Sequence, residues 1–225
     1  MTYFQWFVGV LLLIPAQIMG HVLKNKSFEE KYAWLHRWCR RFIRIIRIPF
    51  KVVGDQHLSS NTVFYACNHQ SFIDPLLISA AIPNPMTYIS KAENNKLPVV
   101  RVWAKNIEMI AFDRSDFNEN VAMLRSAARK LQQGRSILIF PEGTRSKTDQ
   151  LLPFKVGALL PATLAKVPIV PVALIHADLL NQKMRSKTPV IVSIGEPIYP
   201  EQYKGLSHQQ LSDLIFDRIT ALRKL

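Results

Sequence analysis

A chain of 225 residues suits one compact domain with additional material at an end. Because 48% of the residues are hydrophobic and only 20% are charged, a sizeable core can form, and the composition excludes a globally disordered protein. The chain has 29 Lys and Arg against 16 Asp and Glu, and this net charge of +13 favours an anionic partner: nucleic acid, a membrane surface or a phosphorylated substrate.

The first predicted element is an apolar segment at 3–23, in which only His21 can carry a side-chain charge. A helix of this length is about 30 Å long, which is just enough to cross the hydrocarbon core of a membrane. Pro15 and the polar Gln5 and Gln17 weaken the prediction of a spanning helix. No Lys or Arg precedes the apolar run and no small-residue cleavage site follows it, so we do not expect a removable signal peptide.

The next segment, 24–51, is strongly basic, with nine Lys or Arg against two Glu. Its arginines interleave with phenylalanine and isoleucine, which is typical of a helix at a membrane interface, where each cation contributes about 1 kcal/mol near an anionic leaflet. An amphipathic helix that covers the core and leaves its charges in water is the alternative. We expect residues 1–50 to anchor the protein to a membrane. They either span it, which places the remaining chain in the cytoplasm by the positive-inside rule, or lie in one leaflet.

From residue 50 onward, short apolar runs alternate with helical patterns. The predicted strands are 51–54, 62–67, 87–90, 109–112, 136–140, 169–174 and 190–194. The predicted helices are 75–81, 118–133, 156–165 and 209–224. This alternation predicts an α/β fold, with a mixed, largely parallel sheet covered by helices, in one domain at 51–225.

The first candidate site, NHQSFIDP at 68–75, directly follows a predicted strand. Asp74 is a natural N-cap and Pro75 a natural first helical residue, so the segment is a loop between a strand and a helix. Residues five apart on one helix diverge by about 140°, but in a loop that folds back His69 and Asp74 can meet. One ring nitrogen of His69 could then donate to Asp74 while the other takes a proton from a hydroxyl. The alternative is that Asp74 only caps the helix.

Two cations also follow predicted strands. Lys91 comes directly after the strand at 87–90, and Arg114 follows the strand at 109–112. Both could converge with Arg145 on one anion, although scattered surface charge is the better interpretation for either residue alone.

The remaining candidate site, IFPEGTRS at 139–146, closes another apolar strand. Gly143 permits a backbone turn that allows a ligand to approach closely. Arg145 offers a planar fork of donors that suits a phosphate, and Glu142 could orient that guanidinium or bond to a sugar-alcohol hydroxyl. A surface turn with a solvated Glu–Arg pair is the alternative. Because all these loops follow successive strands, they could line one edge of a sheet, where ligands gather in α/β folds.

Four blocks, in order and with compatible spacing, resemble the glycerolipid acyltransferases, the family that includes 1-acylglycerol-3-phosphate acyltransferase. The blocks are NHQSFID at 68–74, the family's HxxxxD box; FDR at 112–114 with Lys91; FPEGTRS at 140–146; and VPIVPV at 167–172, read from sequence alone as a core strand or an acyl-chain wall. The resemblance covers roughly residues 50–200. The chain departs from the family pattern at 94–101, which is basic and lacks the glycine that the family usually has between the Lys and the Asp-Arg of its second block. This difference affects how Lys91 is placed, and it does not affect the central chemistry.

The resemblance implies that His69, oriented by Asp74, deprotonates the sn-2 hydroxyl of lysophosphatidic acid, 1-acyl-glycerol-3-phosphate. The alkoxide then attacks the thioester of acyl-CoA or acyl carrier protein and gives phosphatidic acid, with no metal and no cofactor. The acceptor-binding residues that it implies are Lys91, Arg114, Glu142, Gly143, Thr144 and Arg145.

Other interpretations stay open. The nearest is the same chemistry on another lysophospholipid. A lipid hydrolase or thioesterase is less favoured because the chain has no GxSxG elbow. We expect no nucleic-acid partner, since the charge lies largely in the first fifty residues and no binding motif is present. Cys67, near His69, could suggest a Cys–His nucleophile, but a buried strand thiol is the favoured interpretation.

Overall fold

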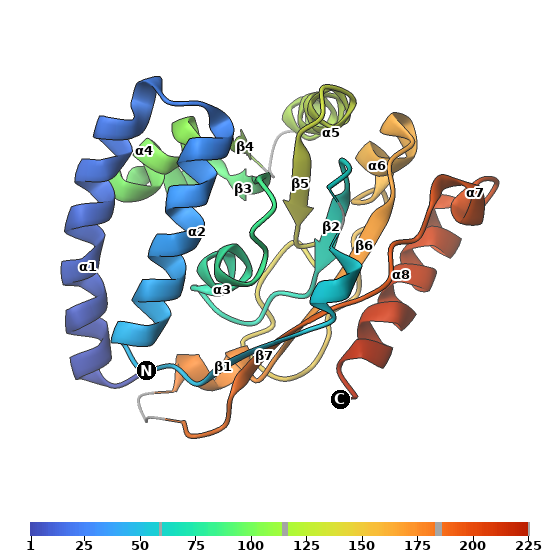
Figure 1. Ribbon diagram of the computed structural model, residues 1–225. Coiled ribbons are helices and arrows are strands. Elements are labelled where there is room, and N and C mark those ends of the chain that lie inside the picture. The colour runs from blue at the N-terminus through green and yellow to red at the C-terminus, as the bar shows by residue number, and fades with distance from the viewer. Residues whose placement is uncertain (59, 114–116, 183–185, 225) are drawn as a thin grey trace.

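The computed structural model describes residues 1–58, 60–113, 117–182 and 186–224. Within these ranges, seven strands form one sheet in the order β1-β7-β6-β2-β5-β3-β4 (Figure 1). The strands are β1 Phe50–Val53, β2 Phe64–Cys67, β3 Met86–Lys91, β4 Ile110–Phe112, β5 Ser136–Ile139, β6 Ile169–Ile175 and β7 Val190–Ile194.

The direction of the strands brings five loops to one edge of the sheet. β6, β2, β5, β3 and β4 run parallel, so their carboxyl ends share that edge. β7 pairs antiparallel with β6, and β1 pairs parallel with β7. All residues of β2, β5 and β6 are buried, as expected for strands covered on both faces. The predicted α/β class with a mixed, largely parallel sheet is confirmed.

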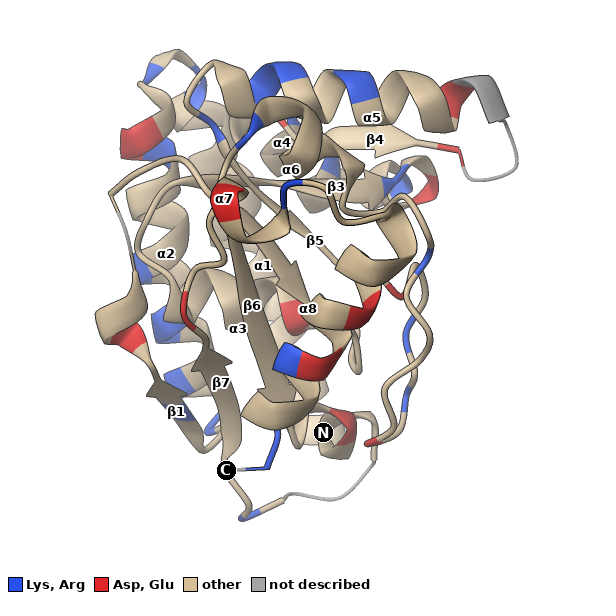
Figure 2. Ribbon diagram, turned by 90° about the vertical axis from the view of Figure 1, so that its right-hand side faces the viewer, with Lys and Arg blue, Asp and Glu red and all other residues tan. Residues whose placement is uncertain are grey.

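Helices cover both faces of this sheet (Figures 1 and 2). α2 (Phe28–Ile45) and α3 (Asp74–Ala81) pack on one face, and α5 (Phe117–Gln132), α6 (Leu160–Ala165) and α8 (His208–Leu222) pack on the other. The side chains of β2 alternate between these two layers, as the pleat of a strand requires. Those that join the core on the α2 side are Tyr65 and Cys67, and those that join the other core are Phe64 and Ala66.

The first helix, α1 (Tyr3–Val22), continues through a short 3₁₀ turn, Leu23–Asn25, into α2, and it lies beside α2 and α4 (Pro98–Asn106) in Figure 1. Three side chains fasten it to the rest of the protein. Gln5 donates to the carbonyl of Ile46 at 2.7 Å. Trp103 and Asn106 of α4 donate to the carbonyls of Ala16 and Gly20, at 3.0 and 2.7 Å. α1 is therefore docked along its length.

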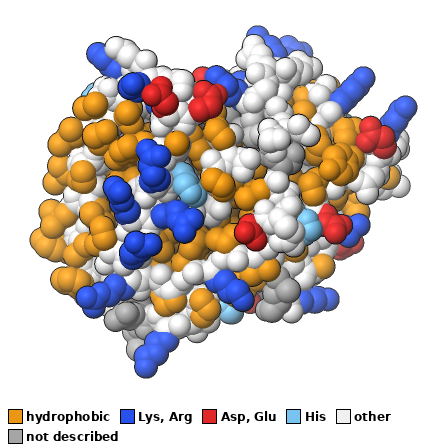
Figure 3. Space-filling model, viewed as in Figure 1, with side chains coloured by type: hydrophobic (Ala, Val, Ile, Leu, Met, Phe, Trp, Pro, Cys, Tyr) orange, Lys and Arg blue, Asp and Glu red, His pale blue; other side chains and the backbone are white. Residues whose placement is uncertain are grey.

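The opposite face of α1 is apolar and exposed. Its exposed large hydrophobic residues are Tyr3, Phe4, Trp6, Phe7, Val10, Leu11, Ile14, Ile18 and Val22. Figure 3 shows hydrophobic side chains gathered over α1, with Lys and Arg side chains next to them over α2. By length and composition, the segment Tyr3–Asn25 could cross a membrane. The apolar N-terminal helix thus favours membrane association, and its docked position is compatible with a helix that lies in one leaflet.

The structure differs from the sequence-based prediction mainly in its helices. α4 and the short α7 (Pro200–Tyr203) were not predicted. The helix predicted at 156–165 is shorter, because α6 begins only at Leu160. The residues before it form turns in which Gly157 has φ +92°, a conformation that a regular helix cannot contain. All seven strands lie within two residues of their predicted bounds.

Candidate active site

The candidate site residues come from neighbouring parallel strands. His69 follows β2, Glu142 follows β5, and Lys91 is the last residue of β3. β5 lies between β2 and β3 in the sheet, with Tyr65 of β2 beside Leu138 of β5. The topology therefore brings the loop that carries His69 next to the loop that carries Glu142.

His69 and Asp74 are joined by a hydrogen bond. The ring Nδ1 of His69 lies 2.7 Å from Oδ2 of Asp74, and the same oxygen accepts from the amides of Gln70 at 2.6 Å and Ser71 at 2.8 Å. The carboxylate of Asp74 is fully buried, whereas the side chain of His69 is 18% exposed. The loop thus folds back as the spacing predicted, and Asp74 fixes the orientation of a ring that solvent can still reach.

The prediction that Asp74 is the N-cap of the following helix was wrong. α3 begins at Asp74 itself, Ile73 occupies the N-cap position, and no side-chain cap is present there. The reason is that the carboxylate turns back towards the amides of the preceding loop instead of the first turn of α3. Its negative charge still lies in the first helical turn, where the helix dipole favours it.

The third block, at 140–146, holds His69 at three further points. The ring of Phe140 stacks on the imidazole with the ring centroids 4.0 Å apart and the planes 15° from parallel. The main-chain amide of His69 donates to Oε1 of Glu142 at 2.7 Å. The main-chain carbonyl of His69 accepts from the amide of Ser146 at 2.8 Å. The ring face, the amide and the carbonyl of one residue are thereby fixed by one loop.

Glu142 is only 2% exposed. Its Oε1 accepts from the His69 amide, and its Oε2 accepts from the amide of Leu152 at 3.1 Å. Burial raises the pKa of the Glu142 carboxyl to about 7, although these two amides and the positive charge of Arg223 act in the opposite direction. A carboxylate that titrates near neutral pH therefore lies directly behind the main chain of His69.

The described residues predicted to bind the acceptor come from the loop after β5 and from the end of β3. Arg145 is exposed, and its guanidinium carbon lies 5.8 Å from the ring centroid of Phe72, within the range of a cation–π contact. Thr144 is exposed beside it, and Gly143 has φ +72°, the left-handed conformation that the predicted turn requires. Lys91 is half-buried at the end of β3. Arg114 lies outside the described residues.

Sequence reasoning missed several polar residues that support the loop carrying His69. The side chain of buried Asn68 bonds to both the amide and the carbonyl of Leu174, at 2.7 and 2.9 Å, and so extends the pairing of β2 with β6. Gln70, also buried, accepts from the amide of Ala177 at 3.1 Å and donates to the carbonyl of Thr148 at 3.3 Å. Amide side chains directly beside a candidate base were the available signal, but their partners are far away in sequence.

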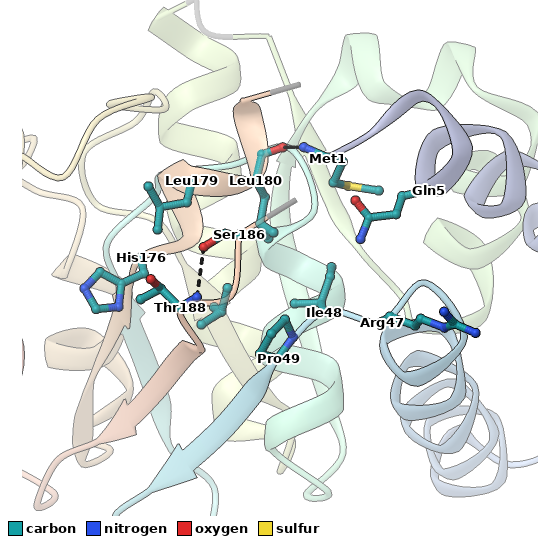
Figure 4. A pocket seen from close by; sticks show the side chains of 11 residues that line it. Met1, Gln5, Arg47, Ile48, Pro49, His176, Leu179, Leu180, Ser186 and Thr188 are labelled. Carbon is teal, nitrogen blue, oxygen red and sulfur yellow. Dashed lines mark hydrogen bonds between the residues drawn. The ribbon is translucent and has the colours of Figure 1, made fainter. Parts of the chain in front are cut away.

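Two other sequence features have structural roles. The fourth block forms the start of β6, whose residues are all buried, so it is a core strand. Burial raises the pKa of the Cys67 thiol well above its usual value, which supports a buried strand thiol over a nucleophile. A small recess between the start of α1 and β7 is lined by Met1, Arg47 and Thr188 and, from the segment after β6, by His176 and Leu180 (Figure 4). Among the described residues that line it, none is a predicted site residue.

Comparison with known proteins decides the family, because an acyltransferase family model matches residues 49–175. The chain belongs to the acyltransferase family. Three relatives named as 1-acyl-sn-glycerol-3-phosphate acyltransferases, one of them as a probable enzyme, support this. The probable one, from Mycoplasma pneumoniae, is 26% identical over 95% of this chain. The proteins from Cocos nucifera and Saccharomyces cerevisiae are 31% and 30% identical over 90% and 87% of it.

The length of the match differs among these acyltransferases. This chain covers 86% of the Mycoplasma protein but only 65% of each of the other two. The fold agrees with a crystal structure of a 1-acyl-sn-glycerophosphate (LPA) acyltransferase from Thermotoga maritima, with a TM-score of 0.75 at 23% identity over 98% of this chain and 97% of that one. The predicted family and fold are therefore confirmed, while the role of each site residue stays a prediction.

Proposed function

We propose that this acyltransferase moves a fatty acyl chain from an acyl thioester to the sn-2 hydroxyl of 1-acyl-glycerol-3-phosphate and so makes phosphatidic acid. The observation that carries the proposal is the bond of 2.7 Å between His69 and buried Asp74, in a chain whose relatives are named for this activity. Acyl-CoA or acyl carrier protein serves as the donor, and the reaction uses no cofactor.

In the proposed reaction, His69 is the general base. Its Nδ1 donates to Asp74, so the neutral ring presents an unprotonated Nε2 that takes the proton of the acceptor hydroxyl. The hydroxyl oxygen forms a bond to the thioester carbonyl carbon and gives a tetrahedral intermediate. When that intermediate collapses, the carbon–sulfur bond breaks and the thiol leaves with the proton from His69. Asp74 stabilises the imidazolium that forms in between.

The acceptor phosphate needs cations near this base. Arg145 is exposed on the loop that contacts His69, and its planar guanidinium suits a phosphate. We assign the phosphate to Arg145 with Lys91 and Arg114, and the glycerol to the turn at Gly143 and Thr144. The family resemblance assigns Glu142 to the same pocket.

The N-terminal helices suit a lipid substrate. The exposed face of α1 is apolar, and α2 carries exposed Arg37, Arg40, Arg41 and Arg44 beside it. Such a surface binds the apolar interior and the anionic headgroups of a leaflet. We propose that residues 1–50 anchor the protein at the cytoplasmic face of the cell membrane and that residues 51–225 form the catalytic domain.

An acceptor panel tests this function. The purified protein is given labelled acyl-CoA or acyl carrier protein together with lysophosphatidic acid, lysophosphatidylethanolamine or lysophosphatidylglycerol. We expect phosphatidic acid as the main product and its loss in His69→Ala with the fold retained. A preference for an acceptor without a phosphate monoester supports another lysophospholipid, and thioester turnover that is equally fast without any lysolipid supports a hydrolase.

A further inference from the structure

The main chain of His69 depends on Glu142. Its amide donates at 2.7 Å to Oε1 of a carboxylate that is almost completely buried. We propose that Glu142 is a positioning residue: it holds the main chain of the base loop in register with the acceptor, and it does not itself bind the acceptor. This inference rests on the proposed function, because it concerns how His69 is held for that reaction.

The contacts of Glu142 leave it poorly placed as an acceptor ligand. Each carboxylate oxygen accepts a main-chain hydrogen bond, Oε1 from His69 and Oε2 from Leu152. The side chain is 2% exposed, whereas Thr144 and Arg145 on the same loop are exposed. A ligand for a glycerol hydroxyl has to reach the surface of the pocket. Glu142 faces the protein interior.

The positions of the two amides explain what the carboxylate achieves. Leu152 belongs to the segment that follows the third block, and His69 belongs to the loop after β2, so Glu142 joins two segments that no strand pairing connects. Hydrogen bonds from amides to a charged carboxylate are roughly twice as strong as those to a neutral acceptor. Asp74 then fixes the ring of His69, and Glu142 fixes the backbone that carries the ring.

The charge of Glu142 is essential to this arrangement. Burial opposes the ionised form, Asp74 opposes it further, and Arg223 favours it together with the two amides. A protonated carboxyl carries a hydrogen on one oxygen, and that oxygen becomes a weaker acceptor for an N–H group. Either protonation or an amide in place of the carboxylate therefore weakens one of the two contacts and loosens the hold on one of the two segments.

The kinetics of Glu142→Gln test the proposal, with Glu196→Gln as a matched control at an exposed position after β7. A displacement of about 1 Å can lower the rate on the order of 10²-fold. We expect Glu142→Gln to lower kcat by about 10- to 100-fold, with the KM for lysophosphatidic acid within about twofold of the wild type and the circular dichroism spectrum of the folded protein retained. We expect Glu196→Gln to leave kcat and the KM for lysophosphatidic acid unchanged. A raised acceptor KM at unchanged kcat would overturn the proposal, because a lost ligand weakens binding.

Amide resonances of the wild-type protein in detergent micelles provide a second measurement, which does not depend on the variant folding. The amide protons of His69 and Leu152 should shift together with one midpoint near pH 7, because both donate to the carboxylate whose pKa burial raises to about 7. Two amides that do not respond between about pH 5.5 and 8.5 would contradict the inference. If the wild type acylates no lysolipid, the proposed function fails, and these resonances still decide whether Glu142 holds the loop.

Discussion

The ring of Phe140 lies flat on the imidazole of His69, with 4.0 Å between the ring centroids and 15° between the planes. Phe140 thus limits the rotation of a ring whose Nδ1 is already held by Asp74. Together the two contacts leave the imidazole one orientation. The first prediction follows from this packing.

We expect Phe140→Leu to lower kcat about 10-fold, because leucine keeps the apolar volume but loses the flat surface that aligns a general base worth roughly 10²–10⁴ in rate. Single-turnover kinetics of acyl transfer measure the chemical step directly. The KM for lysophosphatidic acid serves as the control and should change little. An unchanged single-turnover rate would show that Asp74 alone orients the ring.

The bond between Asp74 and His69 leads to a second prediction. In Asp74→Asn, the neutral amide no longer stabilises the imidazolium that forms when His69 takes the proton. We expect kcat to fall on the order of 10²–10⁴-fold with little change in the circular dichroism spectrum. Rate measurements from pH 6 to 9 check this, and activity within a factor of about three of the wild type would exclude Asp74 as the partner of the base.

Arg145 should act mainly on binding. Its guanidinium is exposed beside Phe72 and is assigned to the acceptor phosphate. Removing a charge-assisted hydrogen bond worth about 1.5–3 kcal/mol predicts that Arg145→Ala raises the acceptor KM by about 10- to 100-fold. Arg145→Lys should recover only part of this, because lysine lacks the planar fork. Initial rates over a range of lysophosphatidic acid concentrations measure the effect, and equal KM values in wild type and variant would remove the assignment.

The exposed face of α1 predicts how the protein binds vesicles. Phe7 and Ile14 are 64% and 57% exposed on this face, so replacing both with serine leaves the packed side of the helix intact. We expect Phe7→Ser with Ile14→Ser to shift the protein from the pellet to the supernatant in sedimentation with anionic vesicles. A variant of two exposed cations, Lys166→Ala with Lys204→Ala, is the control.

Replacing Phe7 and Ile14 with serine is more selective than deleting residues 1–50. α2 contributes Tyr32, Cys39 and Phe42 to the core beside the sheet, so a truncated protein would expose that core. Full retention of the double variant on vesicles at high salt, where the charge of α2 is screened, would contradict a role for the apolar face of α1.

The raised pKa of Glu142 predicts a pH-dependent stability. The folded pKa of about 7 lies above the usual value of 4.5, so the folded state holds this proton more tightly. The corresponding stabilisation is complete below about pH 4.5 and is lost as the pH rises through about 7, by at most about 3 kcal/mol. Glu142→Gln cannot titrate. Its Tm relative to the wild type should therefore increase between pH 5 and 8, and parallel curves would show that Glu142 is not buried as a charge.

The strands were predictable because each is a short apolar run between turn residues, and the pair of His69 and Asp74 was predictable from its place after a strand. α4 was missed because three of its nine residues are β-branched valines, which favour strands over helices, although Pro98 was a helix-start signal. Its importance lies in Trp103 and Asn106, which bond to carbonyls of α1 more than eighty residues away. The contact between Glu142 and the amide of His69 was equally unpredictable, because only the fold decides which main-chain group meets a buried carboxylate.

Gln70 ties the loop that carries His69 to two other loops, through Ala177 after β6 and Thr148 after the third block. Neither of these two loops can move away without breaking its contact with Gln70. Deuterium exchange at the amides of Gln70, Leu152 and Ala177 should therefore proceed at a common rate, as a single cooperative opening. The active-site edge would then fluctuate as one unit rather than as separate flexible segments.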